Sequence, residues 1–145
     1  MSLEVEVIRS PEAFKAAMAI REQAFVIEQG VAPEDECDQY EESSTHFLVR
    51  ENGNPIGTAR WRFTKEGVKI ERVAVKKQLR GRGIGSVLVK AVLDNIESNE
   101  EAKGKMKYLN SQINAITLYE RYGFEKVGEM FEECNILHYR MELKS

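Results

Sequence analysis

The sequence predicts an α/β (α+β) domain in which one mixed sheet carries helices on both faces. Three features predict this fold: two apolar segments joined by a tight turn within 45–63, a strand that leads through a glycine-rich loop into an amphipathic helix within 68–96, and two further strands within 125–143. Paired strands at both ends of a chain, with strand–helix units between them, are typical of a sheet covered by helices. With 145 residues, we expect a single domain over 1–145.

The N-terminal third predicts a strand followed by a helix. Leu3–Arg9 alternates apolar with acidic residues, which is the pattern of a strand. Ser10 and Pro11 are typical of a helix N-cap and of the first helical position. We expect Gly30 and Pro33 to end the helical region. The side chains expected to face inward from this helix are Phe14, Ala17, Met18, Ala24 and Phe25.

Three strands are predicted next, each separated from the following one by a turn. Thr45–Glu51 and Ile56–Phe63 flank the sequence Asn52-Gly53-Asn54-Pro55, which is typical of a hairpin turn. Lys65-Glu66-Gly67 then predicts a second turn, which leads into the strand Val68–Val75.

The long helix of the chain is predicted to begin in the glycine-rich loop Gln78–Gly85. From there, apolar residues recur at the spacing i, i+3, i+4, i+7 of one helix face. These residues are Ile84, Val87, Leu88, Ala91, Val92 and Ile96.

The C-terminal elements are shorter. A polar loop at 99–104 precedes a predicted strand at Lys107–Ser111. We expect a helix over Ala115–Tyr122 that ends at Gly123, because glycine readily adopts the left-handed conformation that follows a helix. Two strands at 125–132 and 136–143 complete the chain.

Composition limits the class of protein. Charged residues make up 31% and hydrophobic residues 42%, as in soluble globular proteins. We find neither a run near the ~18 apolar residues of a membrane helix nor a signal peptide, so we expect a cytoplasmic protein without a membrane partner. The net charge of −3 disfavours a nucleic-acid partner. Cys37 and Cys134 lack the spacing of a metal site, so free thiols and no metal are expected.

The loop Gln78–Gly85 predicts a site for a phosphate-bearing ligand. Glycines allow close approach of a ligand, the N–H groups of the helix start attract anions, and Arg80 and Arg82 add positive charge. A nucleoside-triphosphate loop would need Lys-Ser/Thr after its last glycine, where this chain has Ser86 and Val87. A dinucleotide-binding loop would need G-x-G-x-x-G, but here the third glycine comes one residue early.

The pattern Gln78-x-x-Gly81-x-Gly83 resembles the Q/R-x-x-G-x-G/A motif of the GNAT N-acetyltransferase superfamily, which binds the pyrophosphate of acetyl-CoA. The segment 110–124 resembles the family's Q-x-x-A-x-x-F/L-Y-x-x-x-G-F. Residues 21–29 resemble the R-x-x-V-F-V-x-E-Q signature of its ElaA-like branch, followed here by Glu36, Asp38 and His46. The resemblance covers nearly the whole chain.

Two features depart from the branch pattern. The segment 135–141 resembles the branch's G-I-P-H-x-x-M ending, but Asn135 and Leu137 stand where glycine and proline are usual. Glu71 stands where many relatives have a small residue, and we expect it to affect the acceptor site.

The resemblance implies a GNAT fold, with a central, mostly antiparallel mixed sheet of six to seven strands and with acetyl-CoA as cosubstrate. It also implies that the strand ending at Val75 and the strand ending near Gln112 splay apart to admit the pantetheine arm. The residues that it assigns to the cofactor are Val73, Ala74, Val75, Gln78, Leu79, Arg80, Gly81, Arg82, Gly83, Ile84, Gly85, Ser86, Asn114 and Tyr119.

The implied reaction is transfer of an acetyl group to an amine. A primary amine has a pKa near 10, so only about one molecule in a thousand is neutral at pH 7, and the site must remove its proton. A backbone N–H within 73–75 would stabilise the charge that develops on the thioester oxygen. Tyr119 resembles the tyrosine that faces the sulfur as general acid, with a core aromatic as the alternative; the spacing favours it over Tyr122.

Three residues are candidates for the base. Glu71 is either the base or a partner of Arg72 or a neighbouring lysine in a salt bridge. Glu28 is either a base and acceptor ligand or a helix cap. His138 is either a substrate-site residue or a core histidine, whereas His46 is expected to be structural. The resemblance assigns Phe25, Glu28 and His138 to the acceptor site.

Two further features remain open. The stretch 28–42 carries seven acidic residues and no basic one, and predicts a solvated loop or, alternatively, an acidic rim that attracts cationic amines. Asn114 either contacts the cofactor or caps the helix at Ala115, or does both.

The sequence therefore predicts an acetyl-CoA-dependent N-acetyltransferase that acts by direct transfer in a ternary complex, without an acetyl-cysteine, because Cys37 and Cys134 lie outside both motifs. The alternatives are a non-catalytic coenzyme-A-binding module and a nucleotide-binding domain. The acceptor is expected to be a small-molecule amine of open identity, since amino sugars, polyamines and protein amines also fit. A homodimer is compatible with the resemblance.

Overall fold

A computed structural model describes residues 2–143 as one seven-stranded sheet flanked by helices. The strand order is β1-β2-β3-β4-β5-β7-β6, and the only parallel neighbours among these strands are β4 and β5. The strands are β1 (Leu3–Val7), β2 (Thr45–Glu51), β3 (Asn54–Thr64), β4 (Gly67–Val75), β5 (Lys107–Gln112), β6 (Phe124–Glu133) and β7 (Ile136–Leu143). The predicted mixed, mostly antiparallel sheet is confirmed.

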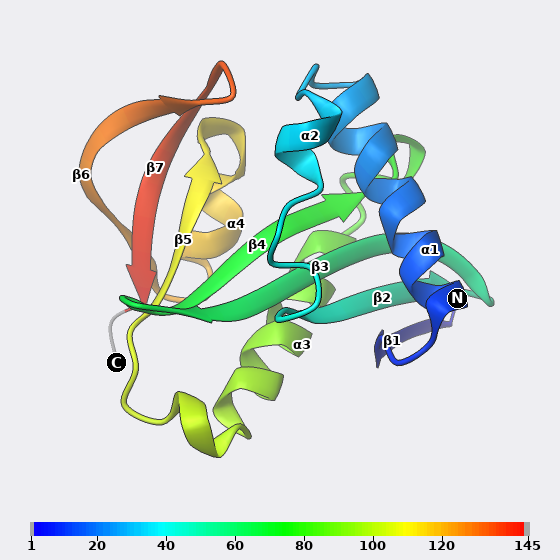
Figure 1. The fold of residues 1–145 in the computed structure, drawn as a ribbon, viewed down its shortest axis with the longest axis horizontal. Coiled ribbons are helices and arrows are strands. Elements are labelled where there is room, and N and C mark those ends of the chain that lie inside the picture. The colour runs from blue at the N-terminus through cyan, green and yellow to red at the C-terminus, as the bar shows by residue number, and fades with distance from the viewer. Residues whose placement is uncertain (1, 144–145) are drawn as a thin grey trace.

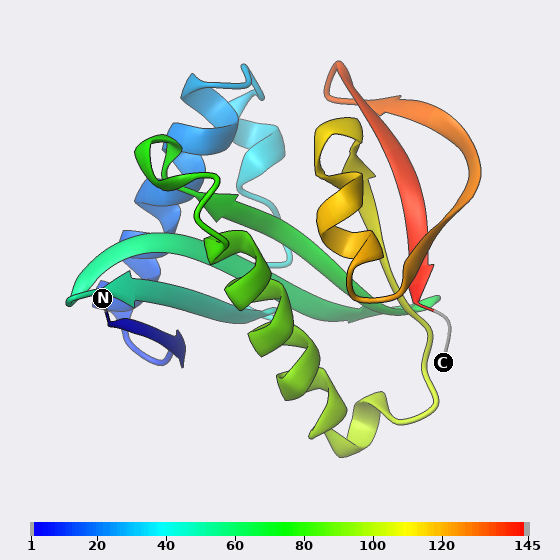
Figure 2. The same cartoon turned by 180° about the vertical axis from the view of Figure 1, so that it is seen from behind.

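Helices cover both faces of this sheet. The helices α1 (Pro11–Arg21) and α2 (Pro33–Glu36) lie on one face, and α3 (Ile84–Glu97) and α4 (Ile116–Glu120) lie on the other (Figures 1 and 2). Helix α1 contacts β2, β3 and β4 from its side, and α3 contacts the same three strands from the opposite side. The hydrophobic core is accordingly divided into two clusters, one under each helical layer.

Local sequence signals account for several boundaries. The hydroxyl oxygen of Ser10 accepts a hydrogen bond from the backbone N–H of Ala13 at 3.2 Å, and Pro11 is the first residue of α1, as predicted. Asn52 and Gly53 have φ of 50° and 85°, and they form a two-residue hairpin turn that is shorter than the predicted four-residue turn.

The helical region before residue 33 differs from the prediction. After α1, the chain continues as one π-helical stretch, Glu22–Ile27. Of the residues predicted to face inward, Ala17 and Ala24 are buried, Met18 and Phe25 are partly buried and pack against the same cluster, and Phe14 is partly buried. The buried face also includes Ala13, Ile20 and Arg21. Pro33 does not end a helix but begins α2, where its fixed φ and missing N–H suit the first position.

The C-terminal helix is shorter than predicted. A 3₁₀ turn at Ile113–Ala115 precedes α4, and the N-cap of α4 is Ala115. Asn114 makes no capping hydrogen bond, so the capping alternative for Asn114 is wrong. Gly123 follows with φ of 93°, as its place after the helix predicts.

The hairpin between β6 and β7 explains one departure from the family pattern. Cys134 and Asn135 have φ of 52° and 64°, and they form the two-residue turn before the last strand. Asparagine is one of the few residues other than glycine that adopts the left-handed conformation readily. Asn135 therefore forms the turn for which relatives use glycine.

The two halves of the sheet separate along the β4–β5 pair. The parallel pairing runs only from Val68 with Lys107 to Ile70 with Leu109. Beyond it, β4 carries a bulge opposite β3, and Arg72 within this part of the strand has φ of 57°. The ends of β4 and β5 therefore diverge, which is the splay that the family resemblance implies.

Candidate active site

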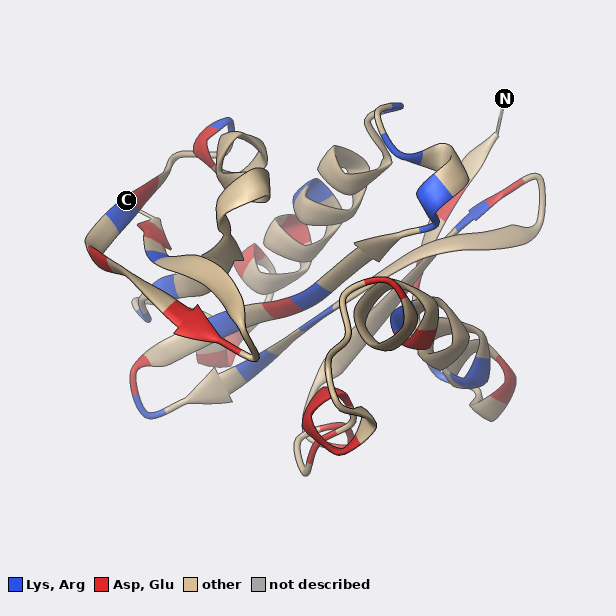
Figure 3. Cartoon of the chain, turned by 90° about the horizontal axis from the view of Figure 1, so that it is seen from above, with Lys and Arg blue, Asp and Glu red and all other residues tan. Residues whose placement is uncertain are grey.

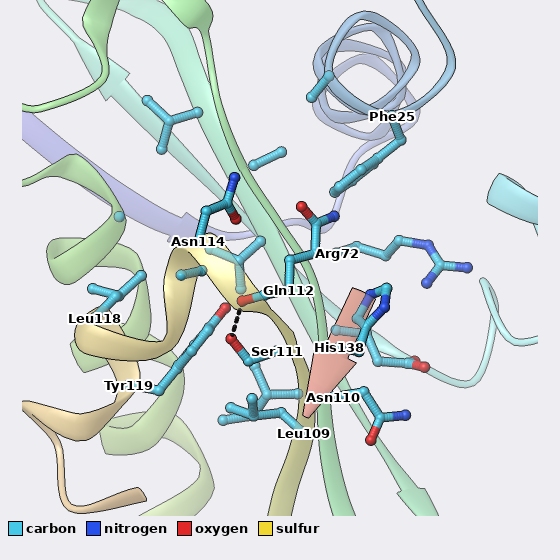
Figure 4. Close-up of a pocket in the computed structure, with 18 of the residues that line it drawn as sticks. Phe25, Arg72, Leu109, Asn110, Ser111, Gln112, Asn114, Leu118, Tyr119 and His138 are labelled. Carbon is cyan, nitrogen blue, oxygen red and sulfur yellow. Dashed lines mark hydrogen bonds between the residues drawn. The ribbon is translucent and has the colours of Figure 1, made fainter. Parts of the chain in front are cut away.

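A cleft of about 890 Å³ lies where β4 and β5 diverge. Its walls come from the end of β4, the loop before α3, the end of β5, α4, the start of β7 and the segment after α1. Figure 4 shows Tyr119, Gln112 and His138 around this space, with Phe25 reaching over it from the α1 side. The cleft thus joins the glycine-rich loop to the residues predicted for chemistry.

Most of the predicted cofactor residues line this cleft. Three of the predicted residues do not line the cleft: Gln78, Arg82 and Ser86. The hydroxyl of Ser86 lies 2.5 Å from the hydroxyl of Tyr122 instead. The predicted cofactor residues that line the cleft are Val73, Ala74, Val75, Leu79, Arg80, Gly81, Gly83, Ile84, Gly85, Asn114 and Tyr119.

The glycine-rich loop has the geometry of an anion cradle. Gly81 and Gly83 have φ of 83° and 82°, and a Cβ at either position would meet nothing within 4 Å. The glycines are therefore required by backbone conformation rather than by crowding. Gly83 is the N-cap of α3, whose first N–H groups lack intrahelical acceptors and carry the positive end of the helix dipole.

Arg80 is held in place beside this cradle. Its Nε donates to the carbonyl oxygen of Val75 at 2.9 Å, and its Nη1 lies 2.7 Å from Oε1 of Glu28. Arg82 instead pairs with Glu51 on the far side of the loop. Of the two arginines, Arg80 is thus the one whose guanidinium belongs to the cleft.

Tyr119 combines deep burial with a hydroxyl that has no protein partner. Its side chain is 7% exposed and packs edge-on against Phe124. Burial raises the pKa of Tyr119 above its ordinary value, so the phenol is neutral at physiological pH. No hydrogen bond to its hydroxyl is formed within residues 2–143, and in Figure 4 the hydroxyl points into the cleft beside Gln112. A neutral donor is therefore available to a bound molecule.

The geometry argues against Glu71 as the base. Its carboxylate lies 2.8 Å from Nη2 of Arg60, 2.8 Å from Nε of Arg62 and 3.1 Å from Nζ of Lys69. Burial alone would raise the pKa of Glu71, but the bond from Arg62 and the charges of Arg60 and Lys69 outweigh it and lower the pKa to about 2. Such a carboxylate has little tendency to take a proton. The sequence suggested Arg72 or a neighbouring lysine as the salt-bridge partner of Glu71. Lys69 is such a partner, whereas Arg72 pairs with Glu36 and Asp38 instead.

Glu71 belongs to an ion-pair network that the sequence did not reveal. Arg60 is fully buried and also contacts Asp38 at 2.7 Å and Glu41 at 2.9 Å, while buried Arg21 bonds to Glu36 at 2.6 Å. The acidic segment around α2 therefore lies against basic positions of β3, β4 and α1 (Figure 3). Glu36, Asp38 and Glu41 are therefore ion-paired rather than solvated. Asp38 and Glu41 also accept backbone N–H groups of their own loop, and Asp35, Glu36 and Asp38 line the cleft.

His138 has the features of a proton acceptor. Its Nδ1 lies 2.7 Å from the carbonyl oxygen of Ile136. A carbonyl can only accept, so this bond requires a hydrogen on Nδ1 and leaves the lone pair of the neutral ring on Nε2. The ring lines the cleft, is 7% exposed and stacks on Phe131. His46, as expected, is structural: its Nε2 is 2.8 Å from the carbonyl oxygen of Glu41.

The two remaining acceptor-site candidates differ. Phe25 lines the cleft, whereas Glu28 is not among the described residues that line it. Gln29, a residue that sequence reasoning missed, forms two hydrogen bonds with the carboxamide of Gln112, at 2.9 and 3.2 Å. These two hydrogen bonds join the segment after α1 to the end of β5. The only sequence signal for it was the Glu-Gln ending of the branch signature.

Two searches of the described residues concern metals and membranes. Within residues 2–143, no three His, Cys, Asp or Glu side chains are grouped so as to hold a metal ion. None of the helices in that range is long and apolar enough to cross a membrane. Both cysteines are free thiols, and Cys134 lies at the edge of the cleft.

Comparisons with known proteins agree with this geometry. A model of the acetyltransferase (GNAT) domain matches residues 10–145. The chain is 33% identical to the uncharacterized N-acetyltransferase YjcF of Bacillus subtilis over 140 residues, covering 96% of this chain and 98% of that protein.

Solved structures give the same result. The crystal structure of Escherichia coli ElaA superimposes with a TM-score of 0.84 at 26% identity, over 99% of both chains. A GNAT family acetyltransferase from Elizabethkingia anophelis with acetyl-CoA bound has the same fold, with a TM-score of 0.68 at 20% identity over 97% of this chain and 94% of that one. From the family match, the relatives and the fold together, the chain belongs to the GNAT family of acetyltransferases and is an acyltransferase enzyme.

Proposed function

We propose that this enzyme transfers an acetyl group from acetyl-CoA to a small-molecule primary amine, directly and within a ternary complex. The observation that supports this most is the cleft between β4 and β5, which connects the glycine-rich loop at one end with Tyr119 and His138 further along it. An elongated donor with a phosphate end and a reactive end fits such a cleft.

The residues present fit coenzyme A. Gly81 and Gly83 leave open space beside the N-terminus of α3, where a pyrophosphate would accept backbone N–H groups. The free edge of β4 at Val73–Val75 would bind the pantetheine arm, since it lacks a β5 partner beyond Ile70. When bound, acetyl-CoA supplies the activated thioester carbonyl. A backbone N–H of the same edge would stabilise the negative charge that develops on that oxygen.

His138 is the residue that we assign to the amine. The Nε2 lone pair takes the proton of the ammonium, either directly or through one water, and so provides the neutral nucleophile. Phe25 covers this part of the cleft and limits the access of water. Because Glu71 is fully engaged with cations, it helps to build the acceptor wall rather than to move protons.

Tyr119 acts on the departing sulfur as a hydrogen-bond donor. Even an ordinary tyrosine, with a pKa of about 10, would transfer its proton to a thiolate of pKa about 8.5 at a cost of roughly 2 kcal/mol. Burial raises the pKa of Tyr119 further, which makes full transfer less favourable still. The neutral phenol therefore stabilises the thiolate without losing its proton.

Direct transfer is favoured over a thioester on the enzyme. Cys134 lies at the edge of the cleft, but burial and the negative charges of Asp35 and Glu133 raise the pKa of its thiol. A thiol rather than a thiolate is a poor nucleophile. Neither Cys134 nor Cys37 is needed for the proposed reaction.

Calorimetric titration with acetyl-CoA, with ATP and NAD as controls, tests the donor. A panel of amines with thiol release as the readout then tests the reaction. Selective acetyl-CoA binding together with amine-dependent thiol release is the expected result. Binding without thiol release for any amine would leave a coenzyme-A-binding module, and the absence of binding would overturn the proposal.

A further inference from the structure

The segment that follows α1 carries a carboxylate that the proposed reaction does not use. Oε1 of Glu28 lies 2.7 Å from Nη1 of Arg80, while Oε2 is shielded from solvent and has no hydrogen-bond partner among the described residues. A buried carboxylate oxygen without a donor is costly. The ion pair with Arg80 is therefore what compensates for the placement of Glu28.

Arg80 is fixed at two points by this arrangement. Its Nε donates to Val75 at the end of β4, and its Nη1 faces Glu28 across the loop. No partner for Nη2 is found within residues 2–143, although the side chain is 43% exposed and lines the cleft beside Gly81. The free edge of the guanidinium is thus presented to the same space as the N-terminus of α3.

We infer that Glu28 is a positioning residue for the pyrophosphate of the donor, not a base and not a ligand of the acceptor. A free arginine side chain loses rotamer freedom when it binds an anion, and this cost is avoided when the guanidinium is already held in place. Glu28 and Val75 hold it before the ligand arrives, and Nη2 and the unused hydrogens are left for the phosphate oxygens. The inference rests on the proposed function for the identity of the ligand.

This assignment also explains why Glu28 lies outside the acceptor end. Its carboxylate reaches toward the loop before α3, while Gln29, the next residue, bonds to Gln112 at the end of β5. Two consecutive residues therefore connect the segment after α1 to both walls of the cleft. Through Arg80, Glu28 contacts the wall that holds the glycine-rich loop, where the charges of the donor would lie.

The test compares a donor that has the pyrophosphate with one that lacks it. For Glu28→Gln, calorimetry is expected to show that free CoA binds about tenfold more weakly, the effect of one arginine that is no longer pre-positioned. The ratio of kcat/KM for acetyl-CoA to kcat/KM for S-acetylpantetheine is expected to fall by the same factor. Glu34→Gln is the matched control, because it removes one negative charge from an exposed position of α2.

Arg80→Lys provides a second, independent variant, since lysine keeps the charge but cannot hold both anchors. We expect it to weaken CoA binding as Glu28→Gln does, and the double variant to be no worse than either single one. Unchanged or tighter CoA binding by Glu28→Gln, or an equal loss with both donors, would overturn the inference. If the wild type binds CoA but releases no thiol, the proposed function fails while the calorimetric comparison still tests Glu28.

Discussion

At the scale of single residues, the chemistry depends on which polar atoms are left without a protein partner. The hydroxyl of Tyr119 has no protein partner within residues 2–143, and Nε2 of His138 has only Oε1 of Glu133, 4.0 Å away. In contrast, the hydroxyl of Tyr122 is bonded to Ser86 and the carboxylate of Glu71 is surrounded by cations. Tyr119, which the motif spacing selected, lines the cleft. For Glu71, the spacing could not show that three cations from β3 and β4 converge on it.

Replacing Tyr119 with Phe tests the role of its hydroxyl. The substitution keeps the ring that packs on Phe124, so the fold is expected to be retained. We expect kcat to fall about 100-fold, the usual effect of losing one donor to a developing anion, with little change in acetyl-CoA affinity. Tyr122→Phe is the control. It removes a nearby tyrosine hydroxyl, but that hydroxyl donates to the backbone of Ser86 and does not face the cleft. Equal kcat for Tyr119→Phe and wild type would remove Tyr119 from the mechanism.

His138→Gln tests the proton acceptor through its dependence on pH. Without the imidazole, the enzyme must capture the rare neutral amine from solution, and this fraction rises about tenfold per pH unit below the amine pKa of about 10. We therefore expect kcat/KM to fall about 100-fold at pH 7 and the loss to shrink steadily toward pH 9. A loss that is the same at every pH would indicate that His138 only shapes the site.

At the scale of elements, the ion-pair network attaches the α2 segment to the sheet. Glu36, Asp38 and Glu41 come from that segment, while their partners Arg21 and Arg60 come from α1 and β3. The sequence shows that seven of the fifteen residues at 28–42 are acidic. It does not show which arginines pair with these carboxylates, because the arginines lie elsewhere in the chain. In contrast, Asn52-Gly53 and Ser10-Pro11 act on their own backbone, and the sequence correctly predicted a hairpin at the first pair and a helix start at the second.

The network makes stability depend on acid pH. The pKa of Glu71 is lowered to about 2 from its ordinary 4.5, so its ion pairs stabilise the fold fully above pH 4.5 and are lost as the pH falls toward 2. For this one largely buried carboxylate, we expect the free energy of unfolding to fall by about 3 kcal/mol over that range. Urea unfolding between pH 5 and 2 measures it. Glu71→Gln should be less stable at pH 6 and show a shallower decline, and a parallel decline would contradict this account.

At the scale of the whole molecule, the enzyme consists of two half-sheets joined by a short parallel pairing. Three residue pairs connect β4 to β5, and beyond them the cleft separates β1–β4 from β5–β7. The sequence predicted the strands on both sides, because each has its own apolar pattern. The divergence of β4 and β5 was expected from the family resemblance alone. Arg72, just beyond the last β4–β5 pair, has a φ of 57°, and no glycine in the sequence marks this position.

Because a donor in the cleft would contact both half-sheets, its binding should stabilise the molecule as a unit. A ligand that binds only the folded state at 100 times its Kd adds about 2.7 kcal/mol, which for a domain of this size raises Tm by roughly 5–10 °C. We expect acetyl-CoA to produce this shift, and ATP and NAD to produce none. Hydrogen exchange should show the protection at the backbone amides of Val73–Val75 and Asn110–Gln112, where the strands lack each other as partners. Protection confined to the glycine-rich loop would mean that the pantetheine arm does not enter the gap between the half-sheets.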